Sequence, residues 1–178
     1  MNNTESAPMF EVFKPMIEMT DGLTLSQVCS ITGLEPSTIQ NWVKRGFVAH
    51  PVNKKYYERQ LARILLISSL RECMKIDNIG ELMTMINGSA DDESDDIISE
   101  QELYDYFCEI ILAASDYSQP IGEIPKLVDK TMIKYNAPSE SANKRLREAL
   151  SVMVYAYTAS EYKKRADGIF EKMREEMK

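Results

Sequence analysis

The spacing of apolar residues in the first half of the chain predicts a series of short helices. The first is expected to begin at a cap formed by Thr24 or Ser26 and to run through Ile31, where Gly33 ends it, because glycine readily adopts the left-handed backbone that closes a helix. A second helix is expected over residues 36–45, with a proline in its first turn, where the missing N–H costs nothing. The two predicted helices are separated by a turn of three to four residues that contains glycine, which is typical of a helix-turn-helix.

The second predicted helix has one apolar and one polar side. At about 100° per residue, Ile39, Trp42 and Val43 fall on one side, and the tryptophan is expected in the core. Amide side chains can pair with adenine edges and lysine can reach guanine or phosphate, so the other side suits a helix that reads the major groove of DNA. A merely solvated helix face would carry the same residue types, and this helix alone leaves both interpretations open. The polar side holds Ser37, Gln40, Asn41 and Lys44.

The rest of the first half predicts a wing and two more helices. Extended residues from 47 to 57 favour a β-wing. The helix that follows, from Tyr57 to Cys73, carries two apolar stripes and is therefore expected to be buried on two sides. One side would close the winged core and the other would meet the C-terminal half or a second subunit, although a simple core helix would look the same. Asp77 is expected to cap a last helix that ends near Asn87.

The second half of the chain is expected to be wholly helical. Residues 88–98 contain a run of acidic and small residues that predicts a linker. Helices are expected over 99–117 and 123–135, and a third from Ser139. The apolar phase of the third slips near residues 158–160, which fits either a break or one long helix with a stutter. Tyrosines and methionines here could line a pocket for a small-molecule effector, though such residues more often fill a core.

Charge divides the chain in the same way. The formal net charge is −7, which by itself argues against nucleic acid. From Pro36 to Lys75, however, eight basic residues stand against two acidic ones, whereas Ser89 to Glu109 holds nine acidic residues and no basic one. The two segments therefore have opposite electrostatic character, and the first could meet DNA phosphates while the second should lie away from them.

Residues that would support other functions are scarce. The three cysteines are far apart and the lone His50 has no nucleophile or ligand set beside it, so neither a metal site nor an enzyme is expected, and no cofactor motif is present. No leader sequence and no apolar run long enough for a membrane span are found, which predicts a cytoplasmic protein without membrane contact.

The order of these elements resembles the DNA-binding domain of the MerR family. The similarity covers about Leu23 to Asn87 and extends to a bacterial family of unknown function that carries this type of head. The motifs that carry it are Leu25–Gly33, Pro36–Gly46, Lys54–Tyr56 and Gln60–Ile67, followed by the short helix at Ile76–Ile86.

The resemblance implies roles for individual residues. Gln40 and Asn41 stand where MerR proteins have an Arg-Tyr pair that contacts base and phosphate, and Lys54 and Tyr56 stand for the arginine and tyrosine of the wing. Glutamine and lysine lack the guanidinium fork of arginine, so a MerR-type DNA sequence preference does not carry over. Metal sensing is not implied, since no cysteine occupies a sensor position.

The sequence thus predicts a mainly α protein: a winged helix-turn-helix DNA-binding domain followed by an all-helical C-terminal domain. Its expected parts are an N-terminal segment (1–22), the head (23–87), an acidic linker (88–98) and a dimerisation or effector domain (99–178). We expect a sequence-specific transcription regulator that binds double-stranded DNA as a homodimer. Alternatives are a protein-interaction module on the same scaffold and, less favoured for lack of aromatic stacking residues, an RNA-binding adaptor. The expected DNA-binding residues are Ser37, Gln40, Asn41, Lys44, Arg45, Lys54, Lys55 and Tyr56.

Overall fold

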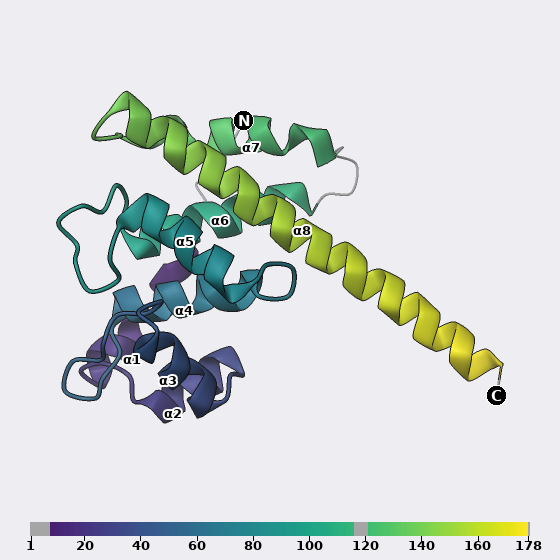
Figure 1. The fold of residues 1–178 in the computed structure, drawn as a ribbon, viewed down its shortest axis with the longest axis horizontal. Coiled ribbons are helices and arrows are strands. Elements are labelled where there is room, and N and C mark those ends of the chain that lie inside the picture. The colour runs from purple at the N-terminus through teal and green to yellow at the C-terminus, as the bar shows by residue number, and fades with distance from the viewer. Residues whose placement is uncertain (1–7, 116–120, 178) are drawn as a thin grey trace.

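Helices form nearly all of the regular structure. The computed structural model describes residues 8–115 and 121–177, and these are mainly helical (Figure 1). Three short 3-10 segments accompany the helices: η1 (Met9–Val12), η2 (Ile121–Glu123) and η3 (Met132–Lys134). The α-helices are α1 (Lys14–Met19), α2 (Leu25–Thr32), α3 (Pro36–Lys44), α4 (Glu58–Leu70), α5 (Ile76–Asn87), α6 (Glu100–Ala114), α7 (Ile124–Thr131) and α8 (Glu140–Glu176).

The ends of α2 and α3 follow from local sequence. Thr24 caps α2 through a reciprocal pair of hydrogen bonds: its Oγ1 accepts from the backbone N–H of Gln27 at 3.3 Å, and the Gln27 side chain accepts from its backbone N–H at 2.8 Å. Gly33 closes α2 with φ of 68°, and Gly46 follows α3 with φ of 74°, both in the left-handed region that favours glycine. Both predicted helices are confirmed.

The region expected to form a β-wing makes only two isolated antiparallel bridges, and no regular strand occurs in residues 8–115 and 121–177. Val52 pairs with Lys55, and Tyr56 pairs with Leu23 at the start of α2. The turn residues between Val52 and Lys55 have φ of 49° and 64°, the pair of left-handed conformations found in the tightest hairpin turns. In the next pair that could hydrogen-bond in such a hairpin, the backbone N–H of His50 donates to Asp91 instead. The expected wing is therefore reduced to a tight turn.

Helix α4 lies at the centre of the molecule. It packs against α2 and α5 of the head and against α6 and α8 of the C-terminal half, and its buried residues lie all round the helix, so the prediction of a helix buried on two sides is confirmed. The second side is filled by the C-terminal half of the same chain. Helix α5 begins after Lys75 without a side-chain cap, so the prediction that Asp77 caps it is wrong; Asp77 lies in the first turn and pairs with Arg45.

A single apolar core joins the two halves. It runs without a break from Phe10 in η1 to Val154 in α8. The N-terminal segment is part of it: the Phe10 N–H donates to Asp105 of α6 at 2.7 Å, and its ring meets Tyr104 edge-on at 6.0 Å. Residues 88–98, predicted as a linker, pack onto the head instead of separating the halves, with Ala90 and Ile98 buried.

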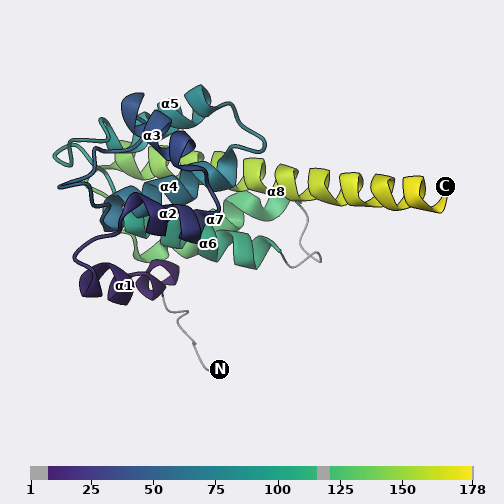
Figure 2. The same ribbon diagram turned by 90° about the horizontal axis from the view of Figure 1, so that it is seen from below.

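The C-terminal half holds the three predicted helices with shifted ends. Ser99 caps α6 as expected, accepting from the Glu102 N–H at 3.2 Å; residues 116–117, predicted as its last turn, lie outside the described residues. The predicted helix over 123–135 is α7 followed by η3. Helix α8 has no break near residues 158–160: it is one helix of 37 residues whose second half projects from the body (Figures 1 and 2).

Inside the head, Gly80 of α5 lies very close to the ring of Phe47. A Cβ at this position of α5 would lie 2.4 Å from the ring of Phe47. We expect Gly80→Ala to lower the free energy of unfolding by about 1–3 kcal/mol, because overpacking outweighs the better helix propensity of alanine. Urea denaturation measures the change. Gly168→Ala is the matched control, since nothing lies near a Cβ at Gly168 in α8, and it should cause no loss. Equal stability of the two variants would contradict the close packing of Phe47 on α5.

Candidate nucleic-acid interface

Helix α3 presents a polar face to solvent while its other face is held in the core. Ile39, Trp42 and Val43 are buried, at 0%, 4% and 9% exposure. The prediction that the tryptophan belongs to the core is confirmed. A three-residue turn, Gly33–Glu35, connects α2 to α3. The four residues predicted for the polar face are all exposed: Ser37, Gln40, Asn41 and Lys44.

The turn at residues 50–55, between α3 and α4, is called the turn after α3 and contributes one exposed cation. Lys54 is exposed at the tip of the turn, as a residue that contacts a partner would be. Lys55 is half-buried and its Nζ donates to the carbonyl oxygens of Thr20 at 2.9 Å and Gly22 at 3.2 Å. Its charge therefore fastens the turn to the end of α1, and the prediction that it is a DNA contact is not supported by its position.

Tyr56 is not a surface residue. It is 4% exposed, and burial raises the pKa of its phenol. Its backbone pairs with Leu23 through two hydrogen bonds of 2.8 Å, which direct the ring into the core. The position therefore has a packing role in this chain, and its burial does not favour the predicted contact of Tyr56 with DNA.

Arg45 is engaged with neighbours of the head. Its guanidinium pairs with Asp77 of α5 and lies over the ring of Phe47, 4.5 Å from the centroid. The arginine therefore ties the end of α3 to α5. A DNA phosphate would have to compete with Asp77 for it.

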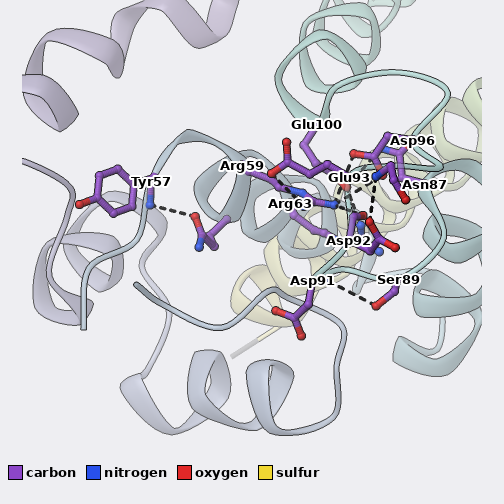
Figure 3. A network of polar contacts seen from close by, with 12 residues as sticks. Tyr57, Arg59, Arg63, Asn87, Ser89, Asp91, Asp92, Glu93, Asp96 and Glu100 are labelled. Atoms are coloured by element: carbon purple, nitrogen blue, oxygen red, sulfur yellow. Dashed lines mark hydrogen bonds and ion pairs between the residues drawn. The ribbon is translucent and has the colours of Figure 1, made fainter. Parts of the chain in front are cut away.

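The acidic segment neutralises part of the basic one inside the molecule (Figure 3). Arg59 of α4 pairs with Glu93 at 3.0 Å and Asp96 at 3.3 Å, and it donates to the carbonyl of Asp92 at 2.8 Å. The two segments of opposite charge thus meet at the start of α4.

The same acidic segment also contacts the turn after α3. The His50 N–H donates to Asp91 at 2.8 Å and holds the pKa of that carboxyl below its usual range. Within the described residues, no hydrogen bond or ion pair joins the acidic segment to the four polar residues of α3. The polar face of α3 therefore remains open.

A buried ion pair lies behind these surface contacts. Arg63 of α4 and Glu100 of α6 pair with side chains 3% and 0% exposed. Arg63 Nε also donates to the carbonyl of Phe47 at 2.9 Å, and Asn87 Nδ2 donates to Glu100 Oε1 at 3.3 Å. Sequence reasoning missed this network, although Arg63, placed among the apolar residues at the middle of the helix, was a signal.

Two hollows adjoin these elements. A polar one of about 530 Å³ lies between the turn after α3, the start of α4 and the acidic segment, and Arg59 and Glu100 are among its walls. A smaller one of about 230 Å³ lies between the end of α6 and α8, where Tyr157 and Tyr162 form part of the lining. Among the described residues, two tyrosines but no methionine line the second hollow, and an effector pocket there stays a prediction.

Among residues 8–115 and 121–177, no group of three or more histidine, cysteine or acidic side chains is placed to hold a metal ion. None of the helices that the structure describes combines the length and apolar character needed to cross a membrane.

The buried ion pair predicts a large mutational effect. Glu100→Gln would leave the Arg63 charge buried without a counter-ion, and we expect a loss of about 3–5 kcal/mol in the free energy of unfolding. Glu93→Gln removes an exposed partner of Arg59 and should cost less than about 1 kcal/mol. Urea denaturation of both variants at pH 7 provides the comparison. Losses of the same size would show that the Arg63–Glu100 pair has no special weight.

Asp96 predicts a pH dependence of stability. Burial raises the pKa of its carboxyl from 3.8 to about 6, Arg59 opposes this and Glu100 adds to it. The folded chain therefore holds a proton that the unfolded chain releases between about pH 4 and 6, and stability falls as the pH rises through this window. Asp96→Asn cannot titrate, so wild type should lose about 1–3 kcal/mol relative to this variant from pH 4 to pH 7.

Urea denaturation across this pH range measures the difference. Asn78→Ala, a change of an exposed amide on α5, is the control and should follow wild type. A constant difference between wild type and Asp96→Asn at all pH values would contradict the raised pKa.

The comparisons with known proteins identify a family. Residues 14–107 match the model of a domain of unknown function, DUF1836, and the chain belongs to this family. The matched segment runs from the start of α1 into α6, so it includes the acidic segment and the Arg63–Glu100 pair as well as the predicted head.

One relative is an uncharacterized protein, YkrK, of Bacillus subtilis (strain 168). It is 32% identical over 94 residues, which are 51% of this chain. The chain spans 40% of the length of that relative. No solved structure matches the chain.

Proposed function

We propose that this protein binds double-stranded DNA as a transcription regulator, with α2 and α3 as a helix-turn-helix and the turn at Val52–Lys55 as a reduced wing. The observation that carries the proposal is the exposed polar face of α3, with Gln40 and Asn41 at its middle. The buried face of the same helix fixes its orientation, which a helix that reads bases requires. The resemblance to MerR heads supports the same assignment.

The polar face of α3 suits base contacts more than phosphate contacts. Gln40 and Asn41 can each pair with an adenine edge, and Lys44 follows one turn after Gln40. The exposed cations of this region are few, with Lys44 on α3 and Lys54 on the turn. With about two phosphate contacts, log K should fall with log salt at a slope of about −2 per head. One head would read only a half-site, so the proposal includes a homodimer.

A protein-interaction module on the same scaffold is the second candidate. The observation in its favour is the internal neutralisation of Arg45, Arg59 and Arg63 by acidic side chains, which reduces the charge available for DNA. The net charge of −7 favours the same alternative. In that case the α3 face would contact a protein surface.

DNA binding can be tested with duplexes that the full chain selects from a random pool. We expect a bound consensus, and we expect Gln40→Ala/Asn41→Ala to relax the preference at one or two base pairs by about 1–3 kcal/mol each. Fluorescence anisotropy over a series of single-base variants measures the change. Asn136→Ala removes an exposed amide between η3 and α8 and is the matched control, with no expected effect.

The same binding experiment also tests the role of the exposed lysine on α3. Lys44→Ala should weaken binding to all sequences alike and reduce the salt slope by about 0.9, whereas Lys130→Ala on α7 should not. Failure to select any duplex at low salt would refute the proposed function and favour the protein-interaction module.

A further inference from the structure

Helix α8 carries a second apolar face that the body of the protein does not cover. Its first face, with Leu146, Leu150 and Met153, is buried in the core. A second set of apolar residues lies on the opposite side, within an arc of about 80° at 100° per residue. We call this set the seam: Tyr155, Ala159, Tyr162, Ala166, Ile169 and Met173. The apolar phase slip in the sequence is therefore a change of face along one straight helix.

The seam is exposed throughout. Tyr155 and Tyr162 are 38% and 46% exposed, and Ile169 and Met173 are 63% and 54% exposed. Ser160 is the last buried residue of α8; beyond Glu161 the described residues are exposed on every side, and the helix extends away from the body (Figures 1 and 2). The projecting part of α8, residues 162–176, has no residue buried against the body. Most of the stability of a helix in a protein comes from packing, so a packing partner would stabilise this part.

The spacing of the seam is that of a coiled coil. The intervals between its residues alternate between four and three, which is the repeat that keeps one apolar line facing a second helix. Several charged residues around it are paired within α8, as Lys163 is with Asp167 at 3.2 Å and Arg174 with Glu171 at 2.8 Å. These pairs reduce the repulsion that another such helix would meet.

The apolar area on and beside the seam approaches that of a dimer interface. At roughly 200 Å² for a fully exposed large side chain, the four large seam residues present about 400 Å², and Phe170 and Met177 beside the seam raise the apolar surface to about 700 Å². The largest apolar patch of an ordinary monomer is about 300–600 Å², whereas each partner in a stable complex buries about 800 Å². We infer that the seam binds the seam of a second copy of this chain.

The sizes of the side chains indicate the direction of the pair. Ala159 and Ala166 alternate with the larger Tyr162 and Ile169 along the seam. In a parallel pair, like positions meet, so tyrosine would lie on tyrosine and alanine on alanine. In an antiparallel pair the small residues of one helix meet the large residues of the other, and the layers fill evenly. The two copies therefore pair in antiparallel fashion.

The first test is the mass of the full chain without DNA. Sedimentation equilibrium at 10–100 µM, on the order of the concentrations at which a micromolar complex forms, should give twice the 20.4 kDa of one chain. Ile169→Asp/Met173→Asp should raise the dissociation constant by about 100-fold or more, because it buries charge in the seam. Lys164→Asp makes the same change in net charge on the opposite side of α8 and should stay dimeric. Circular dichroism verifies that all variants are folded.

A wild-type mass of one chain would overturn the inference, as would a dimer that survives the seam variant. The inference deepens the proposed function by naming the surface that forms the dimer. It rests on the proposed function only for the role of that dimer, which is to place two heads on DNA. A dimer that selects no DNA would refute the proposed function alone, and a monomer that selects DNA would refute the seam alone.

The direction is tested by spin labels on Met177→Cys, with the exposed Cys73 changed to serine. Antiparallel helices should place the two labels about 30–50 Å apart, at 1.5 Å of rise per residue. A separation of about 10–20 Å, as neighbouring parallel helices would give, would overturn the antiparallel arrangement.

Discussion

The buried pair of Arg63 and Glu100 holds the two halves of this protein in one arrangement. It joins α4 to α6 and draws in the Phe47 carbonyl and Asn87, so that the end of α3, the end of α5 and the start of α6 share one network. A buried charge pair tolerates little displacement, since a shift that separates the ions leaves each of them without solvent. The position of the polar α3 face relative to the C-terminal half therefore depends on this contact.

The acidic segment changes the meaning of the charge pattern. Counted along the chain, the basic head and the acidic stretch look like a DNA-binding surface and a spacer that avoids it. In the folded protein, Arg59 and the backbone N–H of His50 bind acidic side chains of this segment. The positive charge available to a partner is therefore much smaller than the number of basic residues in the sequence implies. Recognition through α3 would then depend on the hydrogen bonds of Gln40 and Asn41 more than on electrostatic attraction.

Local chemistry could be predicted from the sequence, and long-range packing could not. The ends of α2 and α3 depend on Thr24, Gly33 and Gly46, whose effects act within one helical turn. The burial of Tyr56 depends on its pairing with Leu23, and the bonds of Lys55 depend on the end of α1, a segment whose short apolar pattern gave no prediction. The contact of Phe10 with α6 joins residues 95 positions apart, which no periodicity can indicate.

The continuity of α8 has a geometric consequence. Met153 in the core and Tyr155 on the seam are two positions apart on one helix, so the rotation of the seam about the helix axis is fixed by the packing of the body. Each residue inserted or removed between the two would turn the outer part by about 100° and move it by 1.5 Å. In the proposed dimer, the length of α8 before the seam would set the angle at which the two bodies face each other, and with it the spacing of their heads. In such an assembly, insertions or deletions in α8 alone could change the distance between the two heads during evolution, without changing the residues of the seam or of the polar face of α3.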